Sequence, residues 1–314
     1  MTVADTPSLV YPIGTAGQPW GAPERERWRA RQRRQRSYAT DVLAPTEALR
    51  SQFDVFDYGE LRAGEERFVL RAVRSRDWRD GLPAVLVTGG VHGYETSGVH
   101  GVLRFLERDA AAYAGRLNLL VVPCVSPWAY ERIQRWNRDA VDPNRSFREA
   151  GVAPEADALM DLVAPDRGRF VVHIDLHETT DSDETEFRPA KAARDGEPFV
   201  PCAIPDGFYL VDDTENPQPG FQQAIIDAVR AVTPIAPADA QGNLIGSPTV
   251  AEGVIRYPLR ELGLCAGITG ARYTTTTEVY PDSALTSPEQ CIAAQCAAVR
   301  AALAFVLRDA GGAR

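Results

Sequence analysis

The sequence predicts an α/β fold, with a mixed, partly parallel sheet flanked by helices on both faces. Three observations favour this fold. From about residue 52 onward, short apolar runs alternate with segments of helical periodicity. Such alternation is typical of sheets that contain parallel strands and are covered on both faces. Clusters of His, Asp, Glu and Arg follow several apolar runs, and sites in open α/β sheets form beyond the carboxyl ends of the strands.

The first half of the domain begins with two runs, FDVFDYGEL and RFVLRAVRS, that predict a hairpin over 53–61 and 67–75. Next comes a strand over 83–90, whose glycine-rich end leads into a helix from about residue 95 to residue 108. Three further elements follow in order: a strand over 117–125, a helix over 155–164 and a strand over 169–177.

The second half contains a short strand over 207–213, a helix over 221–232 and a β-branched strand over 272–280. The last helix has a well-marked start, with Ser287 as N-cap, Pro288 at the first position and Gln290 completing a capping box. We expect this helix to end at Gly311 and Gly312.

Chain length and composition predict one large globular domain preceded by an extension. The chain has 314 residues, of which 44% are hydrophobic and 25% are charged. Residues 51–314 are expected to form a single domain, and residues 1–50 an N-terminal extension that packs on it. The basic run ERERWRARQRRQR in this extension is interpreted as a solvent-exposed helix of mixed charge.

Charge and hydropathy exclude several classes of partner. The net charge of −9 argues against a nucleic-acid partner. Since no apolar run approaches the roughly 20 residues of a membrane-spanning helix, we expect no membrane partner. The N-terminus has no secretory pattern, which predicts a cytoplasmic location. The five cysteines include no C-x-x-C pair and are expected to be buried, reduced thiols. The sequence does not indicate an oligomeric state.

Two histidines and a glutamate form a candidate metal site. His92 and Glu95 form an H-x-x-E pair on the strand-to-helix turn VTGGVHGYETSG, and His177 ends the strand HIDLH. Two imidazoles and one carboxylate are a three-ligand set of catalytic zinc that leaves a fourth position open. Alternatively, His92 is a turn histidine with local hydrogen bonds, and His177 a strand-end histidine without a metal. The spacing by itself leaves both alternatives open.

The strand HIDLH places three polar side chains on one face, because His173, Asp175 and His177 alternate. The simpler interpretation is a hydrogen-bonded strand in which Asp175 orients a neighbour and His173 is buried. The alternative is a second metal near His173 and Asp175, as in two-metal hydrolases. His100 is interpreted as a packing residue.

Four motifs resemble those of a known family. GGVHGYE, VDPNRSF, DLHE and TTTTEVY occur in the order seen in the M14 zinc metallocarboxypeptidases, and they also resemble the related aspartoacylase and succinylglutamate desuccinylase amidohydrolases. The resemblance spans roughly residues 55–305. It implies a zinc carboxypeptidase-like fold, with one zinc ion bound by His92, Glu95 and His177.

The resemblance also implies roles for other residues. Asp142 would hold the first ligand histidine, and a ligating imidazole normally donates its other N–H to such a group. Asn144 and Arg145 would bind the terminal carboxylate of the substrate, for which a guanidinium is well shaped. Arg135 would polarise the scissile carbonyl, and Glu278 would be the general base.

Loops are expected to supply two further parts of the site, a tyrosine that covers the substrate and a wall. A tyrosine on a mobile loop often closes over the substrate in this family, and Tyr257 is favoured over Tyr273 for this role. The segment 178–207 is a candidate wall of the site.

The activity implied by the resemblance is zinc-dependent hydrolysis of an amide bond adjacent to a free carboxylate, by a zinc-bound water assisted by Glu278. The substrate would be a peptide or an N-acyl amino acid with a free carboxylate. An N-acyl-amino-acid deacylase is the main alternative to a carboxypeptidase, and a non-catalytic carboxylate-binding relative is a further one.

Overall fold

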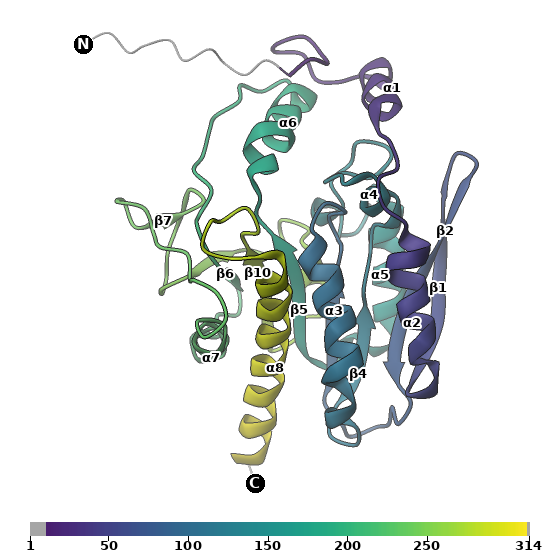
Figure 1. The fold of residues 1–314 in the computed structure, drawn as a ribbon, viewed down its shortest axis with the longest axis vertical. Coiled ribbons are helices and arrows are strands. Elements are labelled where there is room, and N and C mark those ends of the chain that lie inside the picture. Colours follow the sequence, from purple (N-terminus) through teal and green to yellow (C-terminus); the bar gives the residue numbers. More distant parts are fainter. Residues whose placement is uncertain (1–10, 313–314) are drawn as a thin grey trace.

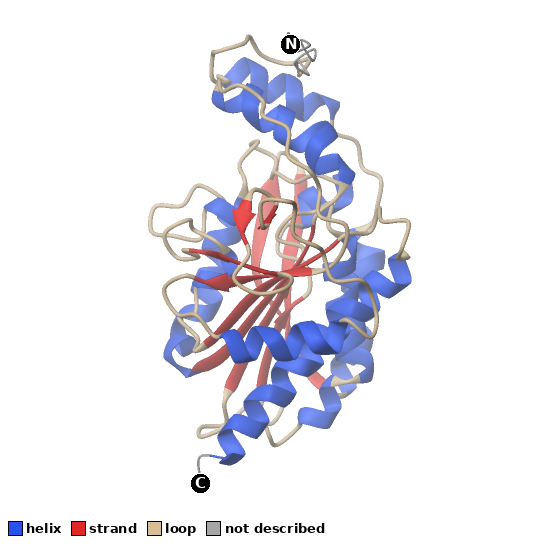
Figure 2. Ribbon diagram, turned by 90° about the vertical axis from the view of Figure 1, so that its left-hand side faces the viewer, coloured by secondary structure: helices blue, strands red, loops and turns tan. Residues whose placement is uncertain are grey.

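The computed structural model describes residues 11–312 and contains a mixed eight-stranded sheet (Figures 1 and 2). Residues 1–10 of the predicted extension and 313–314 of the predicted domain lie outside this described part. In spatial order the strands are β1 (Phe53–Ala63), β2 (Glu66–Ser75), β4 (Asn118–Val122), β3 (Ala84–Gly89), β5 (Phe170–Glu178), β10 (Tyr273–Val279), β6 (Tyr209–Asp213) and β9 (Val254–Tyr257).

The four central strands β4, β3, β5 and β10 run parallel, so their carboxyl ends meet at one edge of the sheet. β1 and β2 form the predicted antiparallel hairpin, and β2 pairs antiparallel with β4. On the other side, β6 runs antiparallel to β10, and β9 runs parallel to β6. The predicted mixed, partly parallel sheet is therefore confirmed.

Helices cover both faces of this sheet, as the alternating pattern predicted. α3 (Thr96–Arg108), α7 (Pro219–Val229) and α8 (Pro288–Gly312) pack on one face, where α3 and α8 lie side by side in Figure 1. α5 (Pro154–Val163) packs on the other face. Successive residues of β3 face opposite cores: Val85 and Val87 belong to the first, Leu86 to the second.

α8 begins as predicted, because the backbone N–H of Gln290 donates to Ser287 Oγ at 3.3 Å. Between Pro288 and Asp309 it is long and apolar enough to cross a membrane by length and composition alone, which differs from the sequence-based expectation. Gln295 and Arg300 interrupt its apolar residues, so the sequence contains no uninterrupted apolar run of this length. In the fold α8 packs against α3, α7 and the sheet, as a core helix of a globular protein does.

The described part of the N-terminal extension contains α1 (Ala22–Arg31) and α2 (Ala44–Ala48). The basic run starts as a helix, but it is not solvent-exposed on all sides. Trp28 is only 1% exposed, and its ring lies 5.6 Å from that of Trp136 and 6.1 Å from that of Trp128. These aromatic contacts join α1 to the domain. The charged residues of the run indicated only the exposed face of this helix.

Several short elements were absent from the sequence-based assignment. They are α4 (Pro127–Arg132), β9, a two-stranded sheet of β7 (Asn243–Leu244) and β8 (Ser247–Pro248), and α6 (Arg188–Asp195). Each has eight residues or fewer, which is too short for a clear hydrophobic period. The five cysteines are all unpaired, and four of them are buried.

Candidate active site

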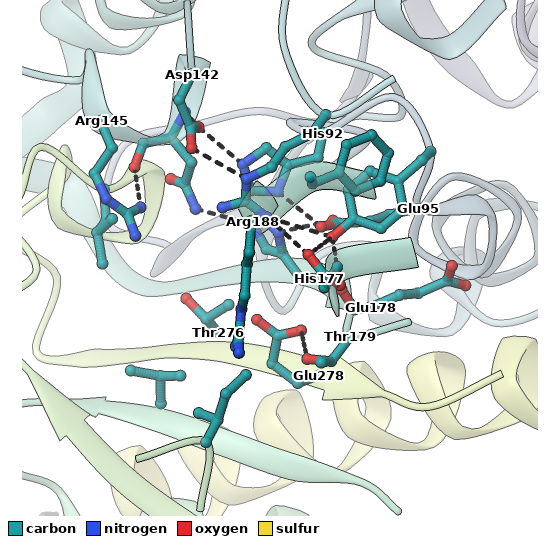
Figure 3. Close-up of a pocket in the computed structure, with 18 of the residues that line it drawn as sticks. His92, Glu95, Asp142, Arg145, His177, Glu178, Thr179, Arg188, Thr276 and Glu278 are labelled. Atoms are coloured by element: carbon teal, nitrogen blue, oxygen red, sulfur yellow. Dashed lines mark hydrogen bonds and ion pairs between the residues drawn. The ribbon is translucent and has the colours of Figure 1, made fainter. Parts of the chain in front are cut away.

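The predicted ligands converge at the carboxyl edge of the parallel strands (Figure 3). His92 and Glu95 lie on the turn between β3 and α3, and His177 lies near the end of β5, next to β3 in the sheet. All three side chains are buried, and one ligand atom from each lies within 4.8 Å of the others. His177 lies 82 positions after Glu95 in the sequence. The three residues nevertheless share one site, because β3 and β5 are adjacent in the sheet.

Glu95 lies between the two imidazoles. Its carboxylate oxygens lie 2.7 Å from His92 Nδ1 and 2.7 Å from His177 Nδ1. Burial raises the pKa of Glu95, but the two imidazoles outweigh it and lower this pKa to about 2. Oε2 of Glu95 is buried without a hydrogen bond of good geometry. These converging nitrogen and oxygen atoms fit the donor set that zinc prefers.

The far side of each imidazole is held by another carboxylate. His92 Nε2 lies 3.0 Å from Asp142 Oδ1, and His177 Nε2 lies 2.6 Å from Asp175 Oδ2. A carboxylate at Nε2 favours the tautomer with its proton there, which leaves the Nδ1 lone pair free for a metal. The structure therefore brings Asp142 to the atom predicted for it, and Asp175 acts in the same way on the second histidine.

Glu278 faces this cluster from β10, where it is the register partner of His177 on β5. Its Oε2 accepts a hydrogen bond from Thr179 Oγ1 at 2.9 Å. Burial, together with the negative charges of Glu95 and Asp183, raises the pKa of Glu278 to about 8. The carboxyl group lies beside the ligands (Figure 3), and it makes no ion pair with an arginine or lysine within the described residues 11–312.

Two arginines in the site have different surroundings. Arg135 Nε donates to Asp142 Oδ2 at 3.2 Å, and its NH1 lies 3.5 Å from Asp183 Oδ1. Arg145 has no carboxylate within 4.0 Å among residues 11–312, and its NH1 donates only to the Asn144 carbonyl, at 2.6 Å. Arg145 is thus free to pair with an incoming anion, whereas Arg135 is already neutralised.

The side chain of Asn144 is largely engaged by the protein. Its Oδ1 accepts a hydrogen bond from the backbone N–H of Cys265 at 2.8 Å, and its Nδ2 lies 3.5 Å from His177 Nε2. Its backbone N–H donates to Asp142 Oδ1 at 2.9 Å. In this arrangement Asn144 shapes the loop around Asp142, and only its amide N–H groups remain for a substrate.

The structure separates the two candidate tyrosines. Tyr257, at the end of β9, lines the cavity, and its hydroxyl lies 3.1 Å from Ser247 Oγ. Tyr273 points into the core, where it packs on Phe221 and donates to Asp309 Oδ2 at 2.8 Å. Of these two candidates, Tyr257 lines the cavity and Tyr273 does not.

A cavity of about 250 Å³ lies over the ligands, and part of its lining comes from the segment 178–207, the predicted wall. This segment is helical in its first half, with a π-helical turn at Asp183–Phe187 followed by α6. It supplies charged and aromatic groups: Asp183, Phe187, Arg188 and Lys191. Pro189 near the start of α6 and Gly196 directly after its end were the sequence signals for this helix.

Comparison with known proteins agrees with this geometry. Residues 81–196, which include all three ligands, match the family model of the succinylglutamate desuccinylase/aspartoacylase catalytic domain. No curated protein matches. A solved structure described as a candidate metallopeptidase, from Shewanella amazonensis, is 23% identical with a TM-score of 0.64, over 85% of this chain and 91% of that one.

Two metallo-carboxypeptidases are also similar. The one from Burkholderia cenocepacia is 16% identical with a TM-score of 0.58, over 92% of this chain and 69% of that one. The one from Pseudomonas aeruginosa, in complex with (2-guanidinoethylmercapto)succinic acid, is 15% identical with a TM-score of 0.55, over the same shares. The chain has a zinc carboxypeptidase-like fold. The resemblance stated from the four motifs is confirmed.

Within this carboxypeptidase-like fold, the remaining histidines lie outside the ligand set. His173 Nε2 lies 3.2 Å from Thr88 Oγ1, which donates to Asp175 Oδ1 at 2.6 Å. His100 is half-buried on α3. Among residues 11–312, His92, Glu95 and His177 form the only cluster with metal-ligand spacing. The face of β5 is thus a hydrogen-bonded network, the simpler of the two interpretations of HIDLH.

Proposed function

We propose that this protein is a zinc-dependent hydrolase that cleaves an amide bond adjacent to a free carboxylate. The observation that carries the proposal is the position of Arg145, which has no acidic partner among residues 11–312, in the same cavity as His92, Glu95, His177 and Glu278. A cation site, a base and an anion-binding group in one small cavity are the parts that this reaction needs. The match to a hydrolase family and the carboxypeptidase-like fold support an enzyme.

His92, Glu95 and His177 would hold one zinc ion, since two imidazole nitrogens and a carboxylate oxygen converge. Asp142 and Asp175 hold the other nitrogen of each imidazole. When bound, zinc supplies a Lewis acid that activates a water molecule and polarises a carbonyl. His173 and Asp175 are occupied by Thr88 and His177, so we propose one metal and not two.

Glu278 would act as the general base. It takes a proton from the attacking water at its carboxylate and returns it to the nitrogen of the leaving amine. Burial raises the pKa of Glu278 to about 8. Because this value is close to neutral pH, the carboxyl group can both accept and release a proton during the reaction. Thr179 holds one carboxylate oxygen and so orients the group.

Arg145 would bind the substrate carboxylate, assisted by the amide N–H groups of Asn144. The Pseudomonas carboxypeptidase binds a succinic acid derivative, which is in keeping with a carboxylate site in this fold. Arg135 lines the cavity between Asp142 and Asp183, and we assign it to stabilise negative charge on the carbonyl oxygen. Tyr257 would cover the bound substrate from the rim.

A second candidate is the deacylation of N-acyl amino acids. The family match supports it alongside the first candidate, because residues 81–196 resemble the succinylglutamate desuccinylase/aspartoacylase catalytic domain. Both reactions break an amide bond next to a carboxylate and would use the same residues. They differ only in the acyl group, so the proposed substrate is either a peptide or an N-acyl amino acid with a free carboxylate.

Metal analysis combined with a substrate panel tests both candidates. We expect about one zinc per chain in the parent protein, its loss in His177→Ala, and its retention in the matched control His100→Ala. The panel compares dipeptides, N-acetyl and N-succinyl amino acids, and the same compounds with an amidated carboxyl group.

The outcomes separate the alternatives. Faster hydrolysis of dipeptides indicates a carboxypeptidase, and faster hydrolysis of N-acyl amino acids indicates a deacylase. Equal hydrolysis of the amidated compounds would contradict carboxylate recognition. Zinc binding without hydrolysis of any compound would indicate a non-catalytic relative.

A further inference from the structure

The loop His92–Thr96 carries two of the three ligands, and its backbone is packed against α4. A side chain at Gly93 would place its Cβ 2.0 Å from the carbonyl carbon of Ala129. The backbone N–H of Tyr94 donates to the Gln134 carbonyl at 3.1 Å. One side of this loop is therefore held by the segment that begins with α4.

Glu178 and Asp183 hold Thr96 and Tyr94 from the domain, and a further set of contacts to this loop comes from the N-terminal extension, through Arg36. Its NH1 donates to Thr96 Oγ1 at 2.8 Å. Its NH2 lies 3.4 Å from the carbonyl oxygen of Gly93 and 3.3 Å from that of Tyr94. One guanidinium thus contacts three residues of the loop and leaves the two ligands, His92 and Glu95, facing the cluster.

Arg36 is itself fixed by the domain. The backbone N–H groups of Gln35 and Arg36 donate to the Glu131 carbonyl at 2.7 and 3.1 Å, and that of Tyr38 donates to Glu131 Oε1 at 3.1 Å. The guanidinium lies 4.6 Å from the centre of the Tyr130 ring. Because Glu131 and Tyr130 belong to α4, Arg36 ties the ligand loop to a helix that already contacts the loop from its other side.

We propose that Arg36 is a positioning residue of the metal site, and that the N-terminal extension is through it a part of the active site. The proposal rests on the proposed function. Metal affinity depends on how well the ligands are held in place before the metal binds, and the groups that hold them have large effects on it. A planar guanidinium can donate to several acceptors at once, and an ammonium cannot reproduce this geometry.

Variants of Arg36 test the proposal through zinc affinity, measured on the metal-free full-length protein by competition with a chelator. Arg36→Met is expected to weaken zinc binding about 10-fold or more, and Arg36→Lys to weaken it less. The matched control is Arg34→Met, because Arg34 lies on the same segment and pairs with Glu66 and Glu131 without contacting the ligand loop. This control should keep the parent affinity.

Thermal unfolding of the metal-free variants separates positioning from a merely structural role. The proposal expects the metal-free melting temperature of Arg36→Met to stay close to that of Arg34→Met while the zinc affinities differ. Zinc binding by Arg36→Met within twofold of the parent overturns it, as does an equal loss in Arg34→Met. If Arg36→Met does not fold, Arg36→Lys decides by the same comparison. A parent protein that binds no zinc overturns the proposed function as well, whereas a parent that binds zinc restricts the failure to this inference.

Discussion

His177 Nε2 lies 2.6 Å from Asp175 Oδ2, two residues earlier on the same strand. The alternation of β5 places both side chains on one face, and Thr88 of β3 donates to the other oxygen of Asp175 at 2.6 Å. The ligand and the group that orients it are thus carried by one strand and held by its neighbour.

The first prediction concerns this pair. Asp175→Asn should weaken zinc binding about 10- to 100-fold, because an amide at this position no longer fixes the His177 tautomer. Chelator competition on the purified variant measures the effect. Asp213→Asn, at the end of β6 and not among the residues that line the cavity, is the control. Unchanged zinc affinity in Asp175→Asn would contradict the assigned role.

The second prediction concerns the general base. Glu278→Gln should lower kcat by about 10²- to 10⁴-fold, because the amide cannot accept the proton of the attacking water. Zinc content should remain that of the parent, since Glu278 is not among the three proposed ligands. Steady-state kinetics together with metal analysis check both statements. Full activity in this variant excludes Glu278 as the base.

The third prediction concerns the anion-binding group. Arg145→Met should raise KM strongly for substrates with a free carboxylate and should leave stability nearly unchanged, because Arg145 makes no ion pair within residues 11–312. Arg145→Lys should recover part of the affinity. The matched control is Arg148→Met, an exposed arginine on the same loop. A KM that is equal in Arg145→Met and the control would rule out the carboxylate site.

The fourth prediction is a pH dependence of stability that originates away from the cavity. Glu155, in the first turn of α5, is only 2% exposed, and burial raises its pKa to about 7. Because the folded state then holds a proton that the unfolded state releases, stability falls as pH rises from about 4.5 to about 7. The loss amounts to about 3 kcal/mol by proton linkage.

Glu155→Gln should reduce this slope by the share that Glu155 contributes and be more stable than the parent at pH 8. Urea unfolding between pH 5 and pH 8 provides the measurement. Asp157→Asn, an exposed acid in the same turn, should keep the slope of the parent. The prediction fails when the parent and Glu155→Gln show the same dependence on pH.

The fifth prediction concerns the ligand loop. Gly93→Ala should lose about 1–3 kcal/mol of stability and bind zinc more weakly, because its Cβ would overlap the backbone of Ala129 and displace His92 and Glu95. Calorimetry and chelator competition test the two effects. Gly168→Ala is the control, since a Cβ there meets no atom within 4 Å. Equal behaviour of the two variants would show that the loop has room to adjust.

Much of the fold and the clustering of the three proposed ligands could be predicted from the sequence, because their signals are local. The strand over 83–90 and the helix after residue 95 have clear periods, and the structure places β3 and α3 there. His92, Glu95 and His177 each follow or end a buried strand, and parallel strands bring such ends together. The start of α8 at Ser287 was likewise visible as a cap.

Contacts between distant segments could not be predicted in this way. Arg135 pairs with Asp142 and with Asp183, which lies 48 positions further along the chain, and only the fold shows these ion pairs. Glu178 caps α3 by accepting from the backbone N–H groups of Thr96 and Ser97, because Glu95 at the N-cap turns its own carboxylate to the imidazoles. Because this cap of α3 comes from β5, 82 positions further along the chain, no local sequence pattern predicts it.

The sequence by itself determined the order of the longer strands and helices and which side chains follow the ends of the predicted strands, because periodicity and turn residues act over a few positions. The tertiary structure decided which of these side chains are already paired, that Tyr257 and not Tyr273 faces the cavity, and that Arg36 reaches the ligand loop. Arg36 and Thr96 are 60 positions apart. Such contacts depend on the path of the whole chain, which places the two segments side by side only after the sheet and its helices have packed.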